Sequence, residues 1–209
     1  MAAVKTASPT QENLEQIGRY PADKLLDKGS HHLTQAELLA ILIDSGISGK
    51  SAIDVANALL DQHAGLYNIY RKGLSVDDFS GLEGLGPAQA ARILAALKIA
   101  RLIYARQRFE RAKRVDLPLF YRAEIERLHN EVDRWSEIGL PASVIGADNA
   151  APPSLKIAEE VILRFSSIER IFGQDLGSLQ EIQGLDAAKV IRIAATLEIA
   201  SRLIRAFQT

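Results

Sequence analysis

The chain lacks cysteine altogether, and this absence excludes several kinds of chemistry at once. With no cysteine among 209 residues, disulfides, thiolate metal sites and a cysteine nucleophile are ruled out, and a reducing compartment is favoured. No run approaches the roughly 18 apolar residues of a membrane span, and the first residues have neither the basic start nor the apolar stretch of a secretory signal. We therefore expect a cytoplasmic protein that has no membrane partner.

Histidine is scarce as well, and the ionisable residues form no catalytic or metal-binding pattern. No histidine has the spacing of metal ligands on one helical face. Lys98 has no neighbour that would activate it for Schiff-base chemistry. Glu110, the acid closest to a glycosylase spacing, lies in a run of arginines. We expect a non-enzymatic protein with no catalytic residue, no metal, no cofactor and no small-molecule substrate. The four histidines are His31, His32, His63 and His129.

Net charge is also low, but it is unevenly distributed along the chain. The whole chain has a formal charge of -1 and 47% hydrophobic residues, as expected of a soluble globular protein with no global attraction to nucleic acid. Residues 92–114 nevertheless contain 8 basic and 1 acidic side chains. This density of positive charge could bind phosphates, although the same residues could simply form the solvent-exposed end of a long helix. The basic residues are Arg92, Lys98, Arg101, Arg106, Arg108, Arg111, Lys113 and Arg114.

Helix signals occur along most of the chain. Thr34 to Glu37 and Ser51 to Asp54 have the pattern of capping boxes before apolar runs. Ser75 to Asp78 predicts a single turn, and Pro87 suits the first position of a long helix. Residues 119–135 carry an apolar stripe at helical spacing. No segment has the sustained alternation of a strand, so we predict an all-α protein.

An internal repeat organises the chain. Residues 83–100 return as residues 183–200, with Arg92 aligned to Arg192. The similarity continues upstream after a two-residue shift, and Ser166 and Ser178 are predicted to cap helices of the second copy. We therefore predict two tandem helical lobes of about 85 residues each.

The repeat contains a glycine turn, residues 82–87, that could hold an anion. Gly84 and Gly86 permit backbone angles closed to other residues, and Leu85 between them is expected to point inward. Exposed N–H groups of such a turn and of the helix after it can bind a phosphate oxygen without reading a base. The alternative is a tight turn between two helices with no ligand. The predicted phosphate-binding residues are Gly84, Leu85, Gly86, Ala88, Gln89, Arg92, Arg101, Arg106, Arg108, Arg111, Lys113 and Arg114.

The second copy departs from this pattern. Asp186 stands in place of Gly86, where its carboxylate would repel a phosphate and could cap its own helix. Lys189 stands in place of Gln89. Each copy therefore lacks one element of a complete phosphate site, and we expect the second turn to be structural.

The glycine turn resembles the helix-hairpin-helix motif of DNA-binding proteins, and a longer stretch resembles a known family. Residues 19–29, 33–42 and 45–50, followed by the glycine turn, are similar in order and spacing to the N-terminal helical region of RadC-type proteins. Those proteins usually have Gly-Thr-Gly where this chain has Asp44-Ser-Gly46. Their metal-binding JAB/MPN domain, with its His-x-His pair, has no counterpart in this sequence, so its activity is not carried over.

The domain boundaries follow from the resemblance and the repeat. We predict a flexible segment over residues 1–18, a RadC-like helix-hairpin-helix lobe over 19–106, a basic linker or helix extension over 107–118, and a diverged second lobe over 119–209.

Two functional hypotheses remain open. The first is sequence-independent DNA binding, as in DNA repair or recombination, by backbone amides and the local basic segment. The second is a protein-interaction or dimerisation module that has lost nucleic-acid binding, with a protein partner or a second copy of the chain on the same surface.

Overall fold

The computed structural model describes residues 11–79, 81–112, 134–146, 152–172 and 174–207. Within these ranges the chain forms helices and one isolated bridge between Ile47 and Lys50, which confirms the all-α prediction. The first repeat contains α2 (Gln35–Ile43), α3 (Ala52–His63), α4 (Leu66–Lys72), η2 (Asp77–Phe79) and α5 (Pro87–Ala112), preceded by α1 (Gln11–Lys28) and η1 (Ser30–His32). The second contains α7 (Arg134–Ile145), α8 (Pro152–Phe165), η3 (Ile168–Ile171), α9 (Leu176–Gln180) and α10 (Ala187–Ala206).

The predicted start signals of the first repeat act as expected. The Thr34 hydroxyl accepts from the Glu37 amide at 3.1 Å, and the Glu37 carboxylate accepts from the Thr34 amide at 2.6 Å. Lys24 of α1 donates to the same carboxylate at 2.8 Å, so the cap also fastens α1 to α2. Ser51 and Asp54 form the second capping box at the start of α3.

Two capping predictions for the second repeat are wrong. Ser178 lies inside α9, which begins after Asp175, and its hydroxyl donates to the Asp175 carbonyl at 2.7 Å. Ser166 has a φ of 65°, whereas an N-cap residue is extended. Neither serine therefore caps the helix of the second copy that was predicted for it.

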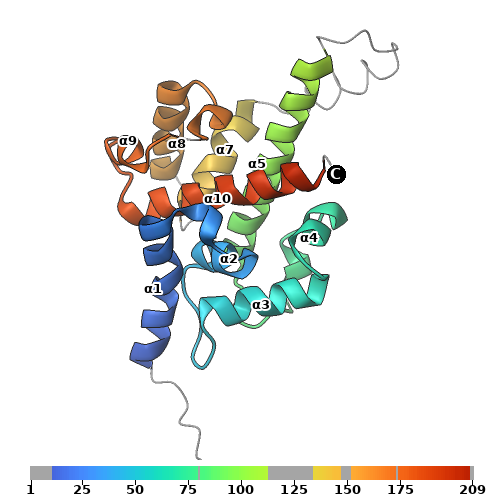
Figure 1. Ribbon diagram of the computed structural model, residues 1–209, viewed down its shortest axis with the longest axis vertical. Coiled ribbons are helices and arrows are strands. Elements are labelled where there is room, and N and C mark those ends of the chain that lie inside the picture. Colours follow the sequence, from blue (N-terminus) through green and yellow to red (C-terminus); the bar gives the residue numbers. More distant parts are fainter. Residues whose placement is uncertain (1–10, 80, 113–133, 147–151, 173, 208–209) are drawn as a thin grey trace, which may run out of the picture.

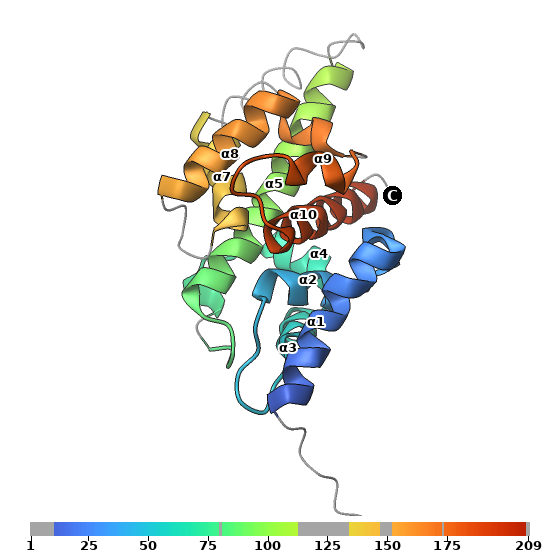
Figure 2. The ribbon, with the colours of Figure 1, turned by 90° about the vertical axis from the view of Figure 1, so that its left-hand side faces the viewer.

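The two repeats share one core. Helix α5 packs against α2 of its own repeat and α7 of the other, and α10 packs against α7 and α2 in the corresponding way. Figure 1 shows α10 crossing α5 near the middle of the molecule, and Figure 2 shows α10 between the helices of both repeats. The buried apolar side chains form a single cluster that extends through both halves. Repeat units of this kind bury too little surface alone, and each completes the core of the other.

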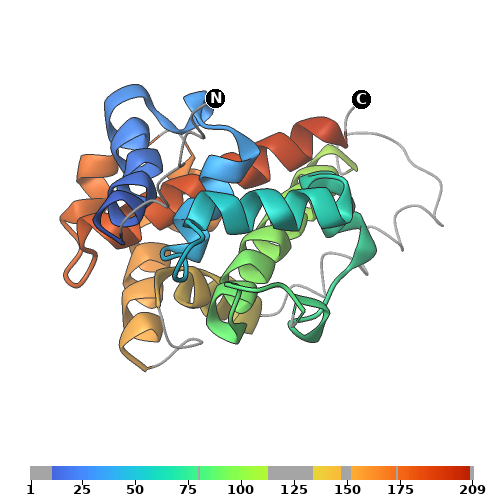
Figure 3. The same ribbon diagram turned by 90° about the horizontal axis from the view of Figure 1, so that it is seen from below.

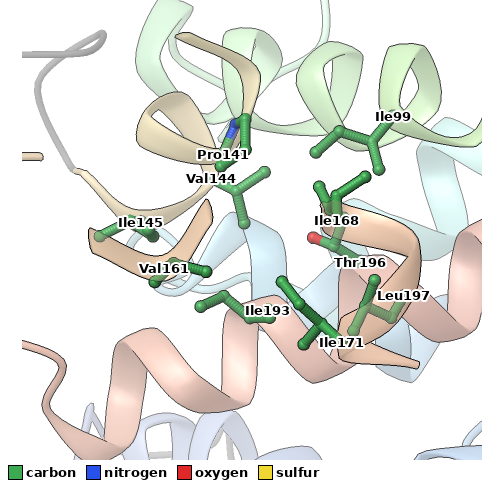
Figure 4. A pocket seen from close by; sticks show the side chains of 10 residues that line it. All are labelled: Ile99, Pro141, Val144, Ile145, Val161, Ile168, Ile171, Ile193, Thr196 and Leu197. Atoms are coloured by element: carbon green, nitrogen blue, oxygen red, sulfur yellow. The ribbon is translucent and has the colours of Figure 1, made fainter. Parts of the chain in front are cut away.

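The junction of the repeats includes a small apolar pocket. Ile99 of α5 faces side chains of α7, α8, η3 and α10 across it (Figure 4). The one polar side chain in its lining is Thr196, whose buried hydroxyl has no hydrogen-bond partner among the described residues. The pocket is a gap in packing between the repeats and has no group that could perform chemistry.

Candidate nucleic-acid interface

The glycine turn of the first repeat depends on side-chain packing as well as on the backbone angles that glycine permits. Leu85 is buried, as predicted, and its amide donates to the Leu82 carbonyl at 3.1 Å. Gly84 has a φ of 92°, and a Cβ at this position would lie 2.7 Å from the Cγ2 of Val55 in α3. Glycine is required here by a left-handed backbone and by the approach of α3. The alternative interpretation, a tight turn between two helices, therefore accounts for glycine at position 84 without a bound phosphate.

Gly86 differs from the prediction, because it does not take a positive φ. It directly precedes α5, and a Cβ on it would lie 2.8 Å from the side-chain oxygen of Gln89. The amides of Ala88 and Gln89 are in the first turn of α5, where a helix has no internal acceptors for its N–H groups. The end of α5 thus keeps donors for an anion, beneath the flexible side chain of Gln89.

Charged side chains next to this turn alter its electrostatics. Glu83 is exposed immediately before Gly84 and forms an ion pair with Lys50 from the loop before α3. A carboxylate therefore stands at the edge of the predicted phosphate site, and its charge is offset by one cation. Sequence reasoning missed Lys50, because the residue lies 33 positions away from Glu83.

In the second glycine turn, Asp186 caps its own helix, as predicted from the sequence. Asp186 caps α10 by accepting from the Lys189 amide at 2.9 Å. The Lys189 ammonium donates to the Asp186 carboxylate at 2.8 Å and to the Gly184 carbonyl at 2.7 Å. Hydrogen bonding from the Lys189 side chain is the main cause that lowers the pKa of Asp186 below its ordinary value. Both charges are used internally, which leaves this turn with a structural role.

Arg92 does not belong to the phosphate site that the sequence suggests. Its side chain is buried, with 3% of the residue exposed, and it donates to the Leu42 carbonyl at 2.5 Å and the Gly146 carbonyl at 3.4 Å. Burial, together with nearby Arg192, lowers the pKa of Arg92. These acceptors lie at the ends of α2 and α7, where carbonyls lack helical partners and a cation is favourable.

Arg192 occupies the corresponding place in the second repeat. It donates to the Ile145 carbonyl at the end of α7 at 3.3 Å, and to the Asp44 carboxylate just after α2 at 2.8 Å. Each repeat therefore supplies one arginine that contacts the C-terminal ends of both α2 and α7, one helix from each repeat. The repeated arginine is explained by this exchange between copies, and it needs no phosphate.

The same contact explains the departure from Gly-Thr-Gly. Asp44 has a φ of 75°, and the Ser45 amide donates to the Ile43 carbonyl at 3.0 Å, which closes a tight γ-turn around it. Glycine adopts such angles at low cost, whereas an aspartate is strained. Here the Asp44 carboxylate gains an ion pair with Arg192 of the second repeat.

The remaining predicted cations lie at the other end of α5. Arg101, Arg108 and Arg111 are exposed and follow each other at spacings of seven and three, which places them on one face of the helix. Arg106 is half-buried. Arg101 lies roughly 22 Å along the helix axis from Gly86, at about 1.5 Å per residue. The predicted set therefore divides between two places, and Lys113 and Arg114 lie outside the described residues.

Helix α4 brings further basic and aromatic side chains to this part of α5, and the residue after the end of α10 adds one aromatic ring. Phe207, after the end of α10, has ring contacts with Tyr67, Tyr70 and Tyr104 at centroid distances of 5.6, 4.7 and 4.9 Å. Figure 1 shows the C-terminal end of α10 beside α4, with the upper part of α5 rising above it. The view from below agrees (Figure 3). We call this surface the basic-aromatic face; it comprises Tyr67, Tyr70, Arg71, Arg101, Tyr104, Arg108, Arg111 and Phe207.

The charge of this face is strongly one-sided. The two segments that supply its cations, residues 66–72 and 101–111, contain six basic side chains and one acidic side chain in the sequence, whereas Arg202 and Arg205 of α10 pair with Glu198. Arg101 and Arg111 make no ion pair within the described part of the chain. Arg108 donates to the Tyr104 hydroxyl at 3.1 Å and lies 5.8 Å from the centre of its ring. Sequence reasoning found the α5 part of this face but missed the α4 and α10 parts, which only folding brings close.

Other kinds of site find no support in the described residues. No group of three or more acidic or histidine side chains in the ranges described could hold a metal ion. Among the same ranges, no helix combines the length and the apolar character needed to cross a bilayer.

Comparison with known proteins agrees with the resemblance seen in the sequence. Residues 15–91 match the family described as UPF0758 N-terminal. A UPF0758 protein of Janthinobacterium sp. (strain Marseille) is 43% identical over 81 residues, which are 39% of this chain and 35% of that protein. A UPF0758 protein of Stutzerimonas stutzeri is 39% identical over 112 residues, 53% of this chain and 49% of that protein. No solved structure matches.

Residues 15–91 are thus similar to the UPF0758 N-terminal region, which confirms the resemblance for this part of the chain. The match spans about a third to a half of the length of the curated relatives. The family region ends at residue 91, before Arg92 and the basic end of α5.

Proposed function

We propose that this protein binds DNA without sequence preference, and that the basic-aromatic face is its main contact. The observation that carries the proposal is the concentration of six basic residues against one acidic residue on residues 66–72 and 101–111, two segments that meet in a chain whose net charge is -1. Such local positive charge binds phosphates and releases counterions, and it reads no base.

The geometry of α5 suits a run of phosphates. Arg101 and Arg111 are separated by ten residues, or about 15 Å of helix, over which duplex DNA carries about nine charges. The guanidinium groups of Arg101 and Arg111 have no carboxylate partner in the described residues, so a phosphate would replace water and not an existing ion pair. Among the described residues, a ligand could therefore use these charges without breaking an ion pair.

The glycine turn at the start of α5 is a second and weaker contact in this proposal. The amides of the glycine turn lie at the start of α5, and the exposed arginines lie near the other end of the same helix. A duplex lying along α5 could therefore contact the amides and the arginines together. The Glu83 carboxylate and the side chain of Gln89 reduce its attraction for phosphate. Arg92, which the sequence placed here, has no part in it.

Fluorescence anisotropy with two duplexes of unrelated sequence tests the proposal. The wild-type protein should bind both with similar affinity at low ionic strength, and Arg101→Gln combined with Arg111→Gln should weaken both equally. Arg164→Gln is the matched control, because it removes an exposed arginine from α8, where its partner is Glu181. Absence of binding at low ionic strength, or equal losses in the control, would refute the proposal.

Gly86→Asp measures the contribution of the glycine turn separately. The substitution imitates Asp186, and the structure accommodates it because Gly86 has no positive φ and meets only the end of the Gln89 side chain. We expect a folded variant with modestly weaker DNA binding. Unchanged binding would remove the turn from the site and leave the basic-aromatic face.

The interaction-module hypothesis makes a different prediction, namely a stable assembly in solution. Exposed large apolar side chains are scattered over the described residues, with Tyr20 and Leu26 on α1, Ile47 before α3, Tyr67 on α4 and Leu163 on α8. Single exposed apolar residues are normal on soluble proteins and do not indicate an interface. Size-exclusion chromatography with light scattering distinguishes the two, because a monomer that binds DNA supports our proposal.

A further inference from the structure

The aromatic residues of the basic-aromatic face are not explained by phosphate binding alone. Tyr67 is 43% exposed, although its ring contacts Phe207. Tyr70, Tyr104 and Phe207 are half-buried behind it and hold the ring cluster together. An exposed ring that is supported from behind by other rings loses little conformational freedom when a flat ligand stacks on it.

The cations are arranged around this ring. Arg71 follows Tyr67 by four residues on α4 and is exposed on the same helical face. Burial raises the pKa of Tyr70, and the nearby charge of Arg101 on α5 offsets part of this rise. Arg108 extends along α5 beyond Tyr104, to which it is hydrogen-bonded. The exposed ring therefore has positive charge on the α4 side and on the α5 side.

We propose that the basic-aromatic face binds single-stranded DNA, with an unpaired base stacked on Tyr67 and flanking phosphates on Arg71, Arg101 and Arg108. This inference rests on the proposed function and narrows it to a substrate class. Proteins that hold single strands combine a basic groove with aromatic rings, since every base offers a π-face and only an unpaired base can leave its neighbours. A duplex would present its phosphates to the arginines but would leave Tyr67 without a partner.

Three oligonucleotides of equal length separate stacking from phosphate binding. They are a thymidine strand of about 16 residues, within the site sizes of known single-strand binders, a strand of abasic residues with the same number of phosphates, and a duplex. The wild-type protein should bind the thymidine strand about 5- to 150-fold more tightly than the abasic strand, the range expected for one base–aromatic stack.

Variants of Tyr67 then locate the stack. Tyr67→Ala should remove most of that preference by lowering affinity for the thymidine strand far more than affinity for the abasic strand or the duplex, and Tyr67→Phe should retain the preference. Tyr20→Ala is the matched control, because Tyr20 is also an exposed tyrosine beside a cation, Lys24, but lies on α1 at a distance from α4 (Figure 1). Circular dichroism melts of each variant confirm that it is folded.

The outcomes distinguish this inference from the proposed function. If the protein binds all three oligonucleotides with strong salt dependence but Tyr67→Ala has no selective effect, stacking on Tyr67 is refuted and phosphate binding stands. Equal affinity of the wild-type protein for the thymidine and abasic strands refutes it as well. If no oligonucleotide binds at low ionic strength, both proposals fail.

Discussion

Replacing Arg92 with methionine should destabilise the protein while leaving nucleic-acid binding intact. The arginine makes two charge-assisted hydrogen bonds to carbonyls at the ends of α2 and α7, each worth about 1.5–3 kcal/mol. Two costs oppose this gain. Burying a guanidinium costs several kcal/mol, and the Nε of Arg92 has no hydrogen-bond partner in the described residues. Because methionine fills the volume but leaves both carbonyls unpaired, we expect a net loss of about 2–3 kcal/mol.

Thermal and urea unfolding followed by circular dichroism measure this loss. For a chain of this size, about 2–3 kcal/mol corresponds to a fall in Tm of roughly 4–12 °C. Arg101→Met is the matched control: the same substitution on the same helix at an exposed position should stay within about 0.5 kcal/mol of the wild type. It should also weaken DNA binding, which Arg92→Met should not. An Arg92→Met variant as stable as the wild type would refute the reasoning.

Further substitutions test the packing of the repeats and one buried titratable group. Gly84→Ala should lower stability by about 2–4 kcal/mol in urea unfolding, from the left-handed backbone and the contact with α3, whereas Gly81→Ala, which meets nothing within 4 Å, should have little effect. Thr196→Val should raise Tm slightly, because it removes a buried hydroxyl without a partner in the described residues; a lower Tm would show that the hydroxyl is satisfied. Burial, followed by the charge of Lys72, lowers the pKa of His63, so stability should be lost as the pH falls below about 6.5, the unfolded value. His63→Leu should flatten this loss between pH 7 and 5, and an unchanged pH profile would exclude His63 as its cause.

The helices of the first repeat were largely predictable from sequence, because their signals are local. Thr34 with Glu37 and Ser51 with Asp54 satisfy helix-start amides within four residues, so no distant contact is needed to form them. Ser178 does not cap a helix, because α9 begins at Leu176 and Asp175 takes the N-cap position.

The candidate site was harder to predict, because charge alone does not tell where a side chain lies. Arg92 and Arg101 belong to the same basic run, yet one is buried at the junction of the repeats and the other is exposed. The partners of Arg92 are 50 and 54 residues away in sequence. The aromatic part of the face comes from α4, α5 and the end of α10, and no spacing within one segment could indicate that Tyr67 and Phe207 meet.

The salt dependence of DNA binding tests the central claim most directly. The logarithm of the binding constant of the wild-type protein on a mixed-sequence duplex should fall linearly with the logarithm of salt concentration. Combined Arg101→Gln, Arg108→Gln and Arg111→Gln should reduce the steepness of this slope by nearly 3, at about 0.9 for each phosphate that the variant no longer neutralises. A slope that is the same in the wild type and the triple variant would contradict the claim that this face holds the phosphates.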